Sequence, residues 1–223
     1  NGGFDLALCS FQMDVVPDVG FFLRKGNDQN YGRYNSSEMT SLIDTLRTQE
    51  DQADFAYTTQ AIQQQFETYM KKNRCYFLNE EETQKVSDYV INSEKQAVNS
   101  AVVGKPAAWI AAHAGISVPE DTKILLARLA DVGPDYPLSR EKLSPVLAYY
   151  VVKDYREGFQ KAKKMLELGG LGHSAVIHSN DLELCSAYGE EMKVGRVITN
   201  SPSSQGAIGD IYNTNTPSLT LGC

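Results

Sequence analysis

His173 is the residue of this chain best suited to acid–base chemistry. It ends the run GGLGH, residues 169–173, between a predicted helix and a predicted strand. An imidazole titrates near neutral pH, so it can move a proton or hydrogen-bond a carbonyl oxygen. The same run also fits a helix C-cap followed by a flexible turn, in which His173 would be satisfied by nearby backbone groups. Residue type alone leaves both interpretations open.

Glu141 and the loop at 200–209 are two further candidates for ligand contacts. Glu141 lies in the run REK, just before an apolar stretch that begins at Pro145. The loop NSPSSQGAIG follows a short apolar run at 196–199, and loops at the carboxyl ends of parallel strands line ligand sites. A carboxylate such as that of Glu141 can bind a hydroxylated ligand, but most glutamates are solvated surface charges. The loop is likewise either part of a site or an ordinary surface connection.

The chain lacks the motifs of several common catalytic and cofactor sites. It has no GxGxxG or GxxxxGK[ST] phosphate loop, no GxSxG nucleophile elbow and no HExxH metal motif. Its four cysteines, Cys9, Cys75, Cys185 and Cys223, form no CxxC pair, which excludes a zinc ribbon or a dithiol redox site. We therefore predict no metal site, and four reduced cysteines with packing roles.

Composition and charge exclude further classes of protein. A hydrophobic share of 42% and a charged share of 22% are typical of a globular chain. The net charge of −7 argues against a nucleic-acid partner, and no apolar run approaches the ~20 residues of a membrane span. Residues 1–68 hold 4 basic and 10 acidic side chains, whereas residues 69–223 hold 17 and 18, which indicates two pieces of different origin. The start at Asn1, with no basic-then-apolar leader, indicates a processed chain or a fragment.

The hydrophobic pattern positions the candidate residues on an α/β framework. Capping boxes at Asn35 with Glu38 and at Asn79 with Glu82 predict two helix starts. Strands that are apolar throughout and separated by helices indicate a mostly parallel sheet with helices on both faces, preceded by a small α+β segment. Further helices are expected at 51–72, 107–114, 154–168 and 181–192, and strands at 4–11, 123–129, 145–152, 174–178 and 196–199.

Residues 69–223 resemble the CoA-acylating aldehyde dehydrogenase half of bifunctional aldehyde-alcohol dehydrogenases. The resemblance implies the catalytic-lobe fold of an aldehyde dehydrogenase for this segment. The matching runs cover nearly all of the segment and are specific to the acylating branch: CYFLNEEE (75–82), GISVPEDTKIL (115–125), PLSREKLSPVLAYY (137–150), GGLGHS (169–174), RVITNSPSSQGAIGDIYN (196–213) and PSLTLGC (217–223).

This resemblance implies an activity, its cofactors and site residues. A cysteine thiolate attacks acetaldehyde, a hydride passes to NAD, and CoA leaves as acetyl-CoA, with the reverse reaction also possible. Glu141 stands where the superfamily places a glutamate that hydrogen-bonds the nicotinamide ribose, and His173 stands at the family's active-site histidine. Asn200 and Gln205 match the loop near the nicotinamide. The family further implies a cytoplasmic enzyme, small-molecule aldehyde and CoA as partners, and possible homo-oligomers.

The chain departs from the family at the nucleophile. A GxICASEQ-like motif should precede residue 75 by some tens of residues, and no such motif is present. The Rossmann-like portion that binds most of NAD is also missing. Cys75 and Cys223 match family positions that are not the nucleophile. We therefore expect the chain as written to be inactive.

Residues 3–67 resemble a different family, the C-terminal part of oligopeptide-type substrate-binding proteins of ABC importers. The matching runs are FDLALCSFQMDVVPDVGFFL, NYGRYNSSEMTSLID and QQQFE. Such proteins are exported and bind peptides between two lobes, and the resemblance implies ligand contacts near Asp14 and Asp18. The chain would then divide into 1–68 and 69–223, with the junction inside a helix. A peptide-binding fragment or a non-catalytic chimera are therefore alternatives to the enzyme portion.

Overall fold

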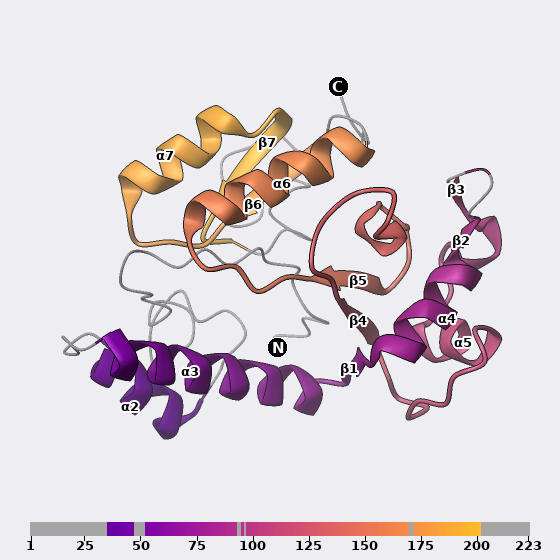
Figure 1. Ribbon diagram of the computed structural model, residues 1–223, viewed down its shortest axis with the longest axis horizontal. Helices are drawn as coiled ribbons and strands as arrows, with labels where there is room; N and C mark the ends of the chain where they lie inside the picture. Colours follow the sequence, from indigo (N-terminus) through magenta and orange to yellow (C-terminus); the bar gives the residue numbers. More distant parts are fainter. Residues whose placement is uncertain (1–34, 47–51, 93–94, 96, 170–171, 202–223) are drawn as a thin grey trace. The chain divides into compact units, whose positions relative to one another are not determined.

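The structure is a computed structural model, described here for residues 35–46, 52–92, 95, 97–169 and 172–201 (Figure 1). It divides into two compact units. The β6–β7 unit comprises Asn1–Glu67, Val152–Lys163 and Leu171–Cys223, and the β1–β4–β5 unit comprises Thr68–Val151 and Lys164–Gly170. Each unit is named after its parallel strands, and each is described by itself below.

The β1–β4–β5 unit is built on a three-stranded parallel sheet with β4 in the centre. Its strands are β1 (Cys75–Leu78), β4 (Ile124–Arg128) and β5 (Val146–Tyr149). The register sets Leu126 opposite Phe77 on one side and opposite Leu147 on the other. The first four residues of β4 are all buried, because ILLA offers apolar side chains to both faces of a central strand.

Helix α4 (Glu80–Val90) shows how local sequence fixes one element of this unit. The Asn79 side chain accepts a hydrogen bond from the Glu82 N–H at 2.9 Å, and the Asn79 N–H donates to the Glu82 carboxylate at 2.9 Å. This is the predicted capping box, and it satisfies two backbone donors at the start of the helix. Val86 and Val90, one turn apart, are then fully buried.

One apolar cluster joins α4 to the sheet and to the rest of this unit. The remaining elements are β2 (Ile91–Asn92), β3 (Ala97–Val98), η1 (Ser100–Val102), α5 (Ala107–His113) and η2 (Pro137–Ser139), with β2 and β3 forming an antiparallel pair. Helix α5 ends before Gly115, whose φ of +74° is costly for any residue with a Cβ. The cluster consists of Leu78, Val86, Val90, Ile91, Val102, Ala107, Ile110, Ala111, Ile116, Leu125, Ala127, Leu138 and Val146.

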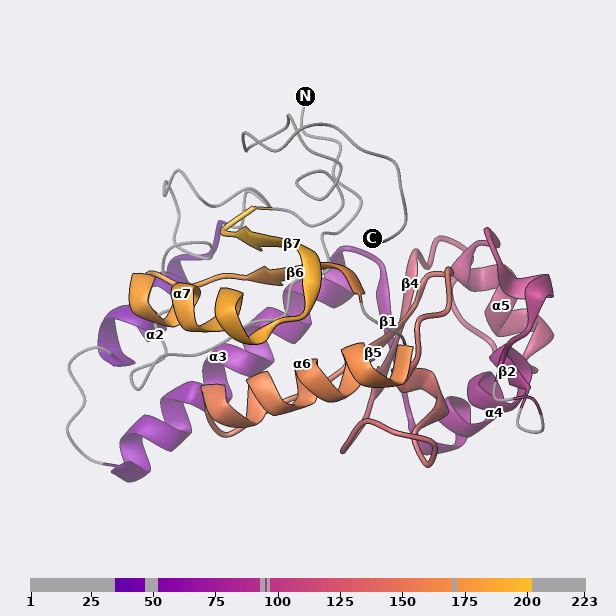
Figure 2. The same cartoon turned by 90° about the horizontal axis from the view of Figure 1, so that it is seen from above.

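The β6–β7 unit is built on a second parallel pair, β6 (Gly172–Ile177) and β7 (Val194–Thr199), connected through α7 (Leu182–Glu191). Asp181 caps α7 by accepting from the Leu184 N–H at 3.0 Å. The first half of α6 (Tyr155–Gly169) lies beside α7 on one side of the strand pair (Figures 1 and 2). The rings of Phe159 and Tyr188 meet edge to face between the two helices, with centroids 5.0 Å apart.

Helices α2 (Ser37–Leu46) and α3 (Gln52–Lys72) precede the first sheet. In α2, Met39 and Ile43 are fully buried, as their spacing predicts. The cap of α2 is Ser36, whose Oγ accepts from the Met39 N–H at 3.1 Å, so the prediction of Asn35 as the cap is wrong by one residue.

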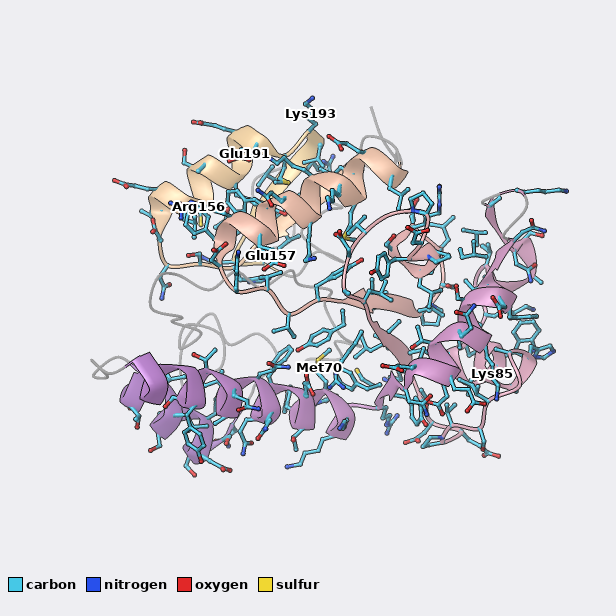
Figure 3. The ribbon with its side chains drawn as sticks, viewed as in Figure 1. Met70, Lys85, Arg156, Glu157, Glu191 and Lys193 are labelled. Atoms are coloured by element: carbon cyan, nitrogen blue, oxygen red, sulfur yellow. The ribbon has the colours of Figure 1, made fainter. Side chains whose placement is uncertain are left out.

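The 21 residues of α3 belong to both units, because the boundary between the units falls after Glu67. Ile62 is buried as predicted, but Thr58 is also buried, whereas the predicted neighbour Thr59 is only partly so. The buried Met70 lies in the last turns of the helix (Figure 3). A helix therefore runs through the point at which the charge balance of the sequence changes.

The predicted α/β class with parallel strands and helices is confirmed, but the strands do not form one sheet. The strands predicted near 123–129 and 145–152 pair in one unit, and those near 174–178 and 196–199 pair in the other. Strand β1 was not predicted. The strand predicted at 4–11 lies outside the described residues. Within the described part of the chain, no helix is long and apolar enough to cross a membrane.

Candidate functional site

Glu141 lies on a short, closely tied turn between η2 and β5, which we call the Glu141 turn (residues 137–143). The turn begins with Pro137, after which the Ser139 N–H donates to Tyr136 O at 2.8 Å and the Arg140 N–H donates to Pro137 O at 3.2 Å. The Glu141 side chain is exposed. The sequence therefore presents a carboxylate to solvent from a backbone that its neighbours hold in place.

Lys142 turns inward where Glu141 turns outward. Only 6% of Lys142 is exposed, and its ammonium donates hydrogen bonds to the carbonyl oxygens of Leu138 and Arg140. Burial lowers the pKa of Lys142 from 10.5 to about 8, and the charge of Glu141 opposes this shift. Lysine is seldom buried to this extent, so sequence reasoning treats the KLSP run as surface and misses it.

Two further contacts tie the Glu141 turn to distant parts of its unit. Arg140 Nη1 donates to Leu168 O at the C-terminal end of α6, at 3.4 Å. The carbonyl of Leu143 accepts from the Gly104 N–H, also at 3.4 Å. Leu143 itself has a φ of +45° and is 58% exposed, which is an unusual geometry for a residue with a Cβ.

The Glu141 turn fits the chemistry of a nucleotide ribose. A carboxylate has two acceptor oxygens, and two neighbouring hydroxyl groups of a ribose can donate to them. Such a bond to a charged acceptor is strong when the acceptor does not have to be ordered on binding. The fixed backbone of the Glu141 turn removes part of this ordering cost, so that only the exposed side chain of Glu141 has to be ordered.

Asn200 lies directly after β7 and clamps the end of the neighbouring strand. Its Oδ1 accepts from the Ser179 N–H and its Nδ2 donates to Ser179 O, both at 2.9 Å. Its own N–H donates to Ile177 O at 2.9 Å. The φ of Asn200 is +53°, a conformation that asparagine tolerates better than most residues. The carboxamide is thus engaged with the backbone at both of its ends, and the residue ties the end of β7 to the segment that follows β6.

The segment that Asn200 clamps contains a buried histidine that the sequence did not single out. His178 is 5% exposed, and burial lowers its pKa from 6.5 to about 4, so its imidazole is neutral at pH 7. Ser179 is 2% exposed, and its carbonyl also receives a hydrogen bond from the Cys185 thiol at 3.7 Å. A polar run such as HSND after a strand is a weak signal of burial, because the same letters are common in surface turns.

His173 is the second residue of β6, not part of the turn before it as predicted. The strand begins at Gly172, because parallel pairing with Val194 extends it toward the glycines. The side chain of His173 is outside the described residues. So are Asp14, Asp18 and Gln205. Glu141 belongs to one unit, and His173 and Asn200 belong to the other.

The described residues include two cysteines, of which Cys75 is buried and Cys185 is partly buried. Cys75, in β1, is 5% exposed, and burial raises its pKa from 9.0 to about 11. A thiol with such a pKa stays protonated near neutral pH, so Cys75 has the packing role that the sequence predicts. Cys185, in α7, is partly buried. Among the described residues, no group of three or more histidine, cysteine, aspartate or glutamate side chains could hold a metal ion.

Comparison with known proteins supports the resemblance of the larger segment. The aldehyde-alcohol dehydrogenase of Streptococcus pneumoniae is 46% identical over 169 residues, which are 73% of this chain and 19% of that protein. The bifunctional aldehyde-alcohol dehydrogenase of Escherichia coli is 41% identical over 73% of this chain and 18% of that protein. The acetylating aldehyde dehydrogenase of Geobacillus thermoglucosidasius superposes with a TM-score of 0.67 at 43% identity, covering 73% of this chain and 35% of that one.

Most of this chain is similar to acylating aldehyde dehydrogenases. The similarity holds in sequence and in the α/β fold. The chain spans less than a fifth of the length of these two curated relatives. No family model matches the chain.

The resemblance of residues 3–67 to substrate-binding proteins stays a prediction. Its residues 3–34 and 47–51 lie outside the described part of the chain. None of the relatives reported above is a substrate-binding protein. The division of the chain into segments of two origins, 1–68 and 69–223, likewise stays a prediction.

Proposed function

We propose that this chain carries part of a CoA-acylating acetaldehyde dehydrogenase, which converts acetaldehyde, CoA and NAD to acetyl-CoA, NADH and a proton, and catalyses the reverse reaction. The exposed carboxylate of Glu141, on a turn whose backbone is tied at several points, is the observation that supports this most directly. It lies within the segment whose sequence and fold are similar to acylating aldehyde dehydrogenases.

In this proposal each candidate residue has one role. Glu141 accepts hydrogen bonds from the ribose hydroxyls next to the nicotinamide. His173 lies at the reacting carbon, where a histidine can hold or move a proton. Asn200 and Gln205 belong to the segment that the resemblance assigns to the nicotinamide end of the site, and Asn200 holds the ends of β6 and β7 together. NAD, when bound, accepts a hydride, and CoA takes the acyl group as a thioester.

We further propose that the thiol nucleophile is not among the residues of this chain. Cys75 supports this, because burial keeps its thiol protonated. Cys9 and Cys223 lie outside the described residues, and none of Cys9, Cys185 and Cys223 stands in the motif of the family's nucleophile. The chain by itself then keeps only residual affinity for NAD and CoA and does not turn over acetaldehyde.

Titration of the chain with NADH, followed by the fluorescence of the dinucleotide, tests the proposal. Wild type is expected to bind, and Glu141→Gln is expected to bind about tenfold more weakly, since hydrogen bonds to a charged acceptor contribute roughly 1.5–3 kcal/mol. Glu120→Gln, which changes another exposed glutamate of the same unit, is the matched control and should bind like wild type. Absence of NADH binding by wild type would contradict the proposal.

Thermal unfolding separates this proposal from its alternatives. A ligand that binds the native state raises the unfolding temperature. A rise with NADH or CoA supports the enzyme portion, whereas a rise with peptides alone would favour a peptide-binding fragment. A measurable rate of NADH formation from acetaldehyde and CoA would show that the chain does contain a nucleophile.

A further inference from the structure

Lys142 is a buried charged side chain that the proposed function does not use. It is 6% exposed, whereas the other lysines in the described part of the chain are largely at the surface, such as Lys85 on α4 (Figure 3). Taking an ammonium out of water costs several kcal/mol unless its hydrogen bonds replace the lost solvent. The residue therefore needs a structural account beyond packing.

The two acceptors of Lys142 are backbone carbonyl oxygens that lie two residues apart in the Glu141 turn. One is Leu138 O, in η2, and the other is Arg140 O, the carbonyl that precedes Glu141. Lys142 itself follows Glu141 directly. The side chain thus closes a ring across residues 138–142, and Glu141 lies inside this ring with its carboxylate turned to solvent.

Closure of this ring fixes the backbone of Glu141 from two directions. The peptide before Glu141 is held through the carbonyl oxygen of Arg140, and the peptide after it belongs to Lys142, whose side chain is anchored in the interior. A neutral amine still has two N–H groups, so both bonds can persist when the ammonium loses its proton. A fixed backbone lowers the entropy that a glutamate loses when it binds a ligand.

We propose that Lys142 is a positioning residue, which ties Leu138 O to Arg140 O and thereby aims the Glu141 carboxylate at the ribose hydroxyls of NAD. The inference rests on the proposed function, in which Glu141 faces the cofactor. Lys142 makes no contact with the ligand in this account, and its effect on binding passes entirely through Glu141. A lysine that only packs the turn would affect stability without this dependence.

A double-mutant cycle on NADH affinity tests the dependence on Glu141. The four proteins are wild type, Lys142→Met, Glu141→Gln and the double variant, with Lys85→Met as the control for loss of a lysine. We expect Lys142→Met to bind NADH about fivefold more weakly, because misplacement of a contact group is costly. The double variant should bind no more weakly than Glu141→Gln alone. Additive losses in the double variant would overturn the inference.

Amide hydrogen exchange gives a readout that needs no ligand. Amides 139–143 should exchange faster in Lys142→Met than in wild type, while those of α4 remain protected. Unchanged exchange at 139–143 would overturn the positioning role even if wild type binds NADH. Absence of NADH binding by wild type would instead overturn the proposed function and, with it, the link to the cofactor. If Lys142→Met does not fold, Lys142→Gln, which keeps an amide donor, takes its place in both measurements.

Discussion

In each unit a single polar side chain clamps the backbone near a candidate residue: Lys142 does so in the Glu141 turn, and Asn200 does so at the ends of β6 and β7. Lys142 donates to two carbonyl oxygens two residues apart in sequence. Asn200 both donates to and accepts from one residue, Ser179, which is 21 positions away. The first contact organises a local turn, whereas the second joins the ends of two strands.

A protein can thus position a candidate site residue with a clamping side chain that is either charged or neutral. The clamp formed by Asn200 is neutral, and the clamping residue is itself the candidate that the sequence proposes. The clamp formed by Lys142 is ionisable, and the candidate is its neighbour Glu141. The two clamps should therefore respond differently to mutation and to pH.

The largest effect is expected at Asn200. Asn200→Ala removes both bonds to Ser179 and places at a φ of +53° a residue that tolerates this conformation less well than asparagine does. Loss of the bond to the N–H of the buried Ser179 costs roughly 1–3 kcal/mol, and loss of the bond to its carbonyl, which still accepts from the Cys185 thiol, costs about 1 kcal/mol. Alanine in this conformation adds about 1 kcal/mol, so we expect a loss of about 4 kcal/mol. Exchange protection of the β6 and β7 amides measures it. Asn180→Ala, at an exposed position of the same segment, is the control; an equal loss there would contradict the clamp.

The second effect tests the difference in charge between the Lys142 clamp and the Asn200 clamp. The pKa of Lys142 falls from 10.5 to about 8 on folding, so the unfolded chain binds more protons between these values and the contribution of Lys142 to stability grows as pH rises from 8 to 10.5. At about 1.4 kcal/mol per pKa unit, the free energy of unfolding of wild type minus that of Lys142→Met should rise by up to about 3 kcal/mol over this pH range. Urea unfolding of both proteins at several pH values measures this difference, and a difference that falls as pH rises would refute the prediction.

A third prediction concerns acid and the β6–β7 unit. His178 has a folded pKa of about 4 against 6.5 unfolded, so the stability it contributes is complete above pH 6.5 and is lost as pH falls toward 4. Between pH 6.5 and 5 wild type should lose about 2 kcal/mol more than His178→Gln. The same hydrogen-exchange measurement, repeated at each pH, reports the difference. Equal acid sensitivity of the two proteins would mean that His178 is not the responsible group.

The smallest effects are expected at the two helix caps, Asn79 of α4 and Asp181 of α7. Asn79 forms a reciprocal capping box with Glu82, whereas the Asp181 side chain accepts from the N–H of Leu184, whose apolar side chain cannot return a bond. Asn79→Ala should cost about 1 kcal/mol, and Asp181→Ala about the same or slightly less. Exchange at the first turns of α4 and α7 separates the two. A larger loss at Asp181 would show that reciprocity adds nothing here.

The sequence predicts best what neighbouring residues decide. Asn79 and Glu82 are three positions apart, and their capping box follows from that spacing. Helix α3 and strand β4 follow from composition over a short window. Strand β1 was missed because CYFL is short and follows a helix after two residues, and only pairing with β4 reveals it.

The predictions fail where distant residues decide. Nothing local to 123–129 or 174–178 indicates that these strands belong to different sheets, because strand pairing is a choice among distant partners. Lys142 was missed for a related reason, since only the folded turn shows that its charge faces inward. Glu141 was proposed from a resemblance, and the structure adds the backbone ties that no pattern of letters contains.

Leu143, at the end of the Glu141 turn, offers a practical use of this geometry. A leucine with a φ of +45° strains its backbone by about 1 kcal/mol, and 58% of it is exposed to water. Glycine adopts the same conformation freely and carries no side chain. Leu143→Gly would thus relieve the backbone strain and remove an exposed apolar side chain, which makes the variant a good candidate for crystallisation. The carboxylate of Glu141 would be left intact.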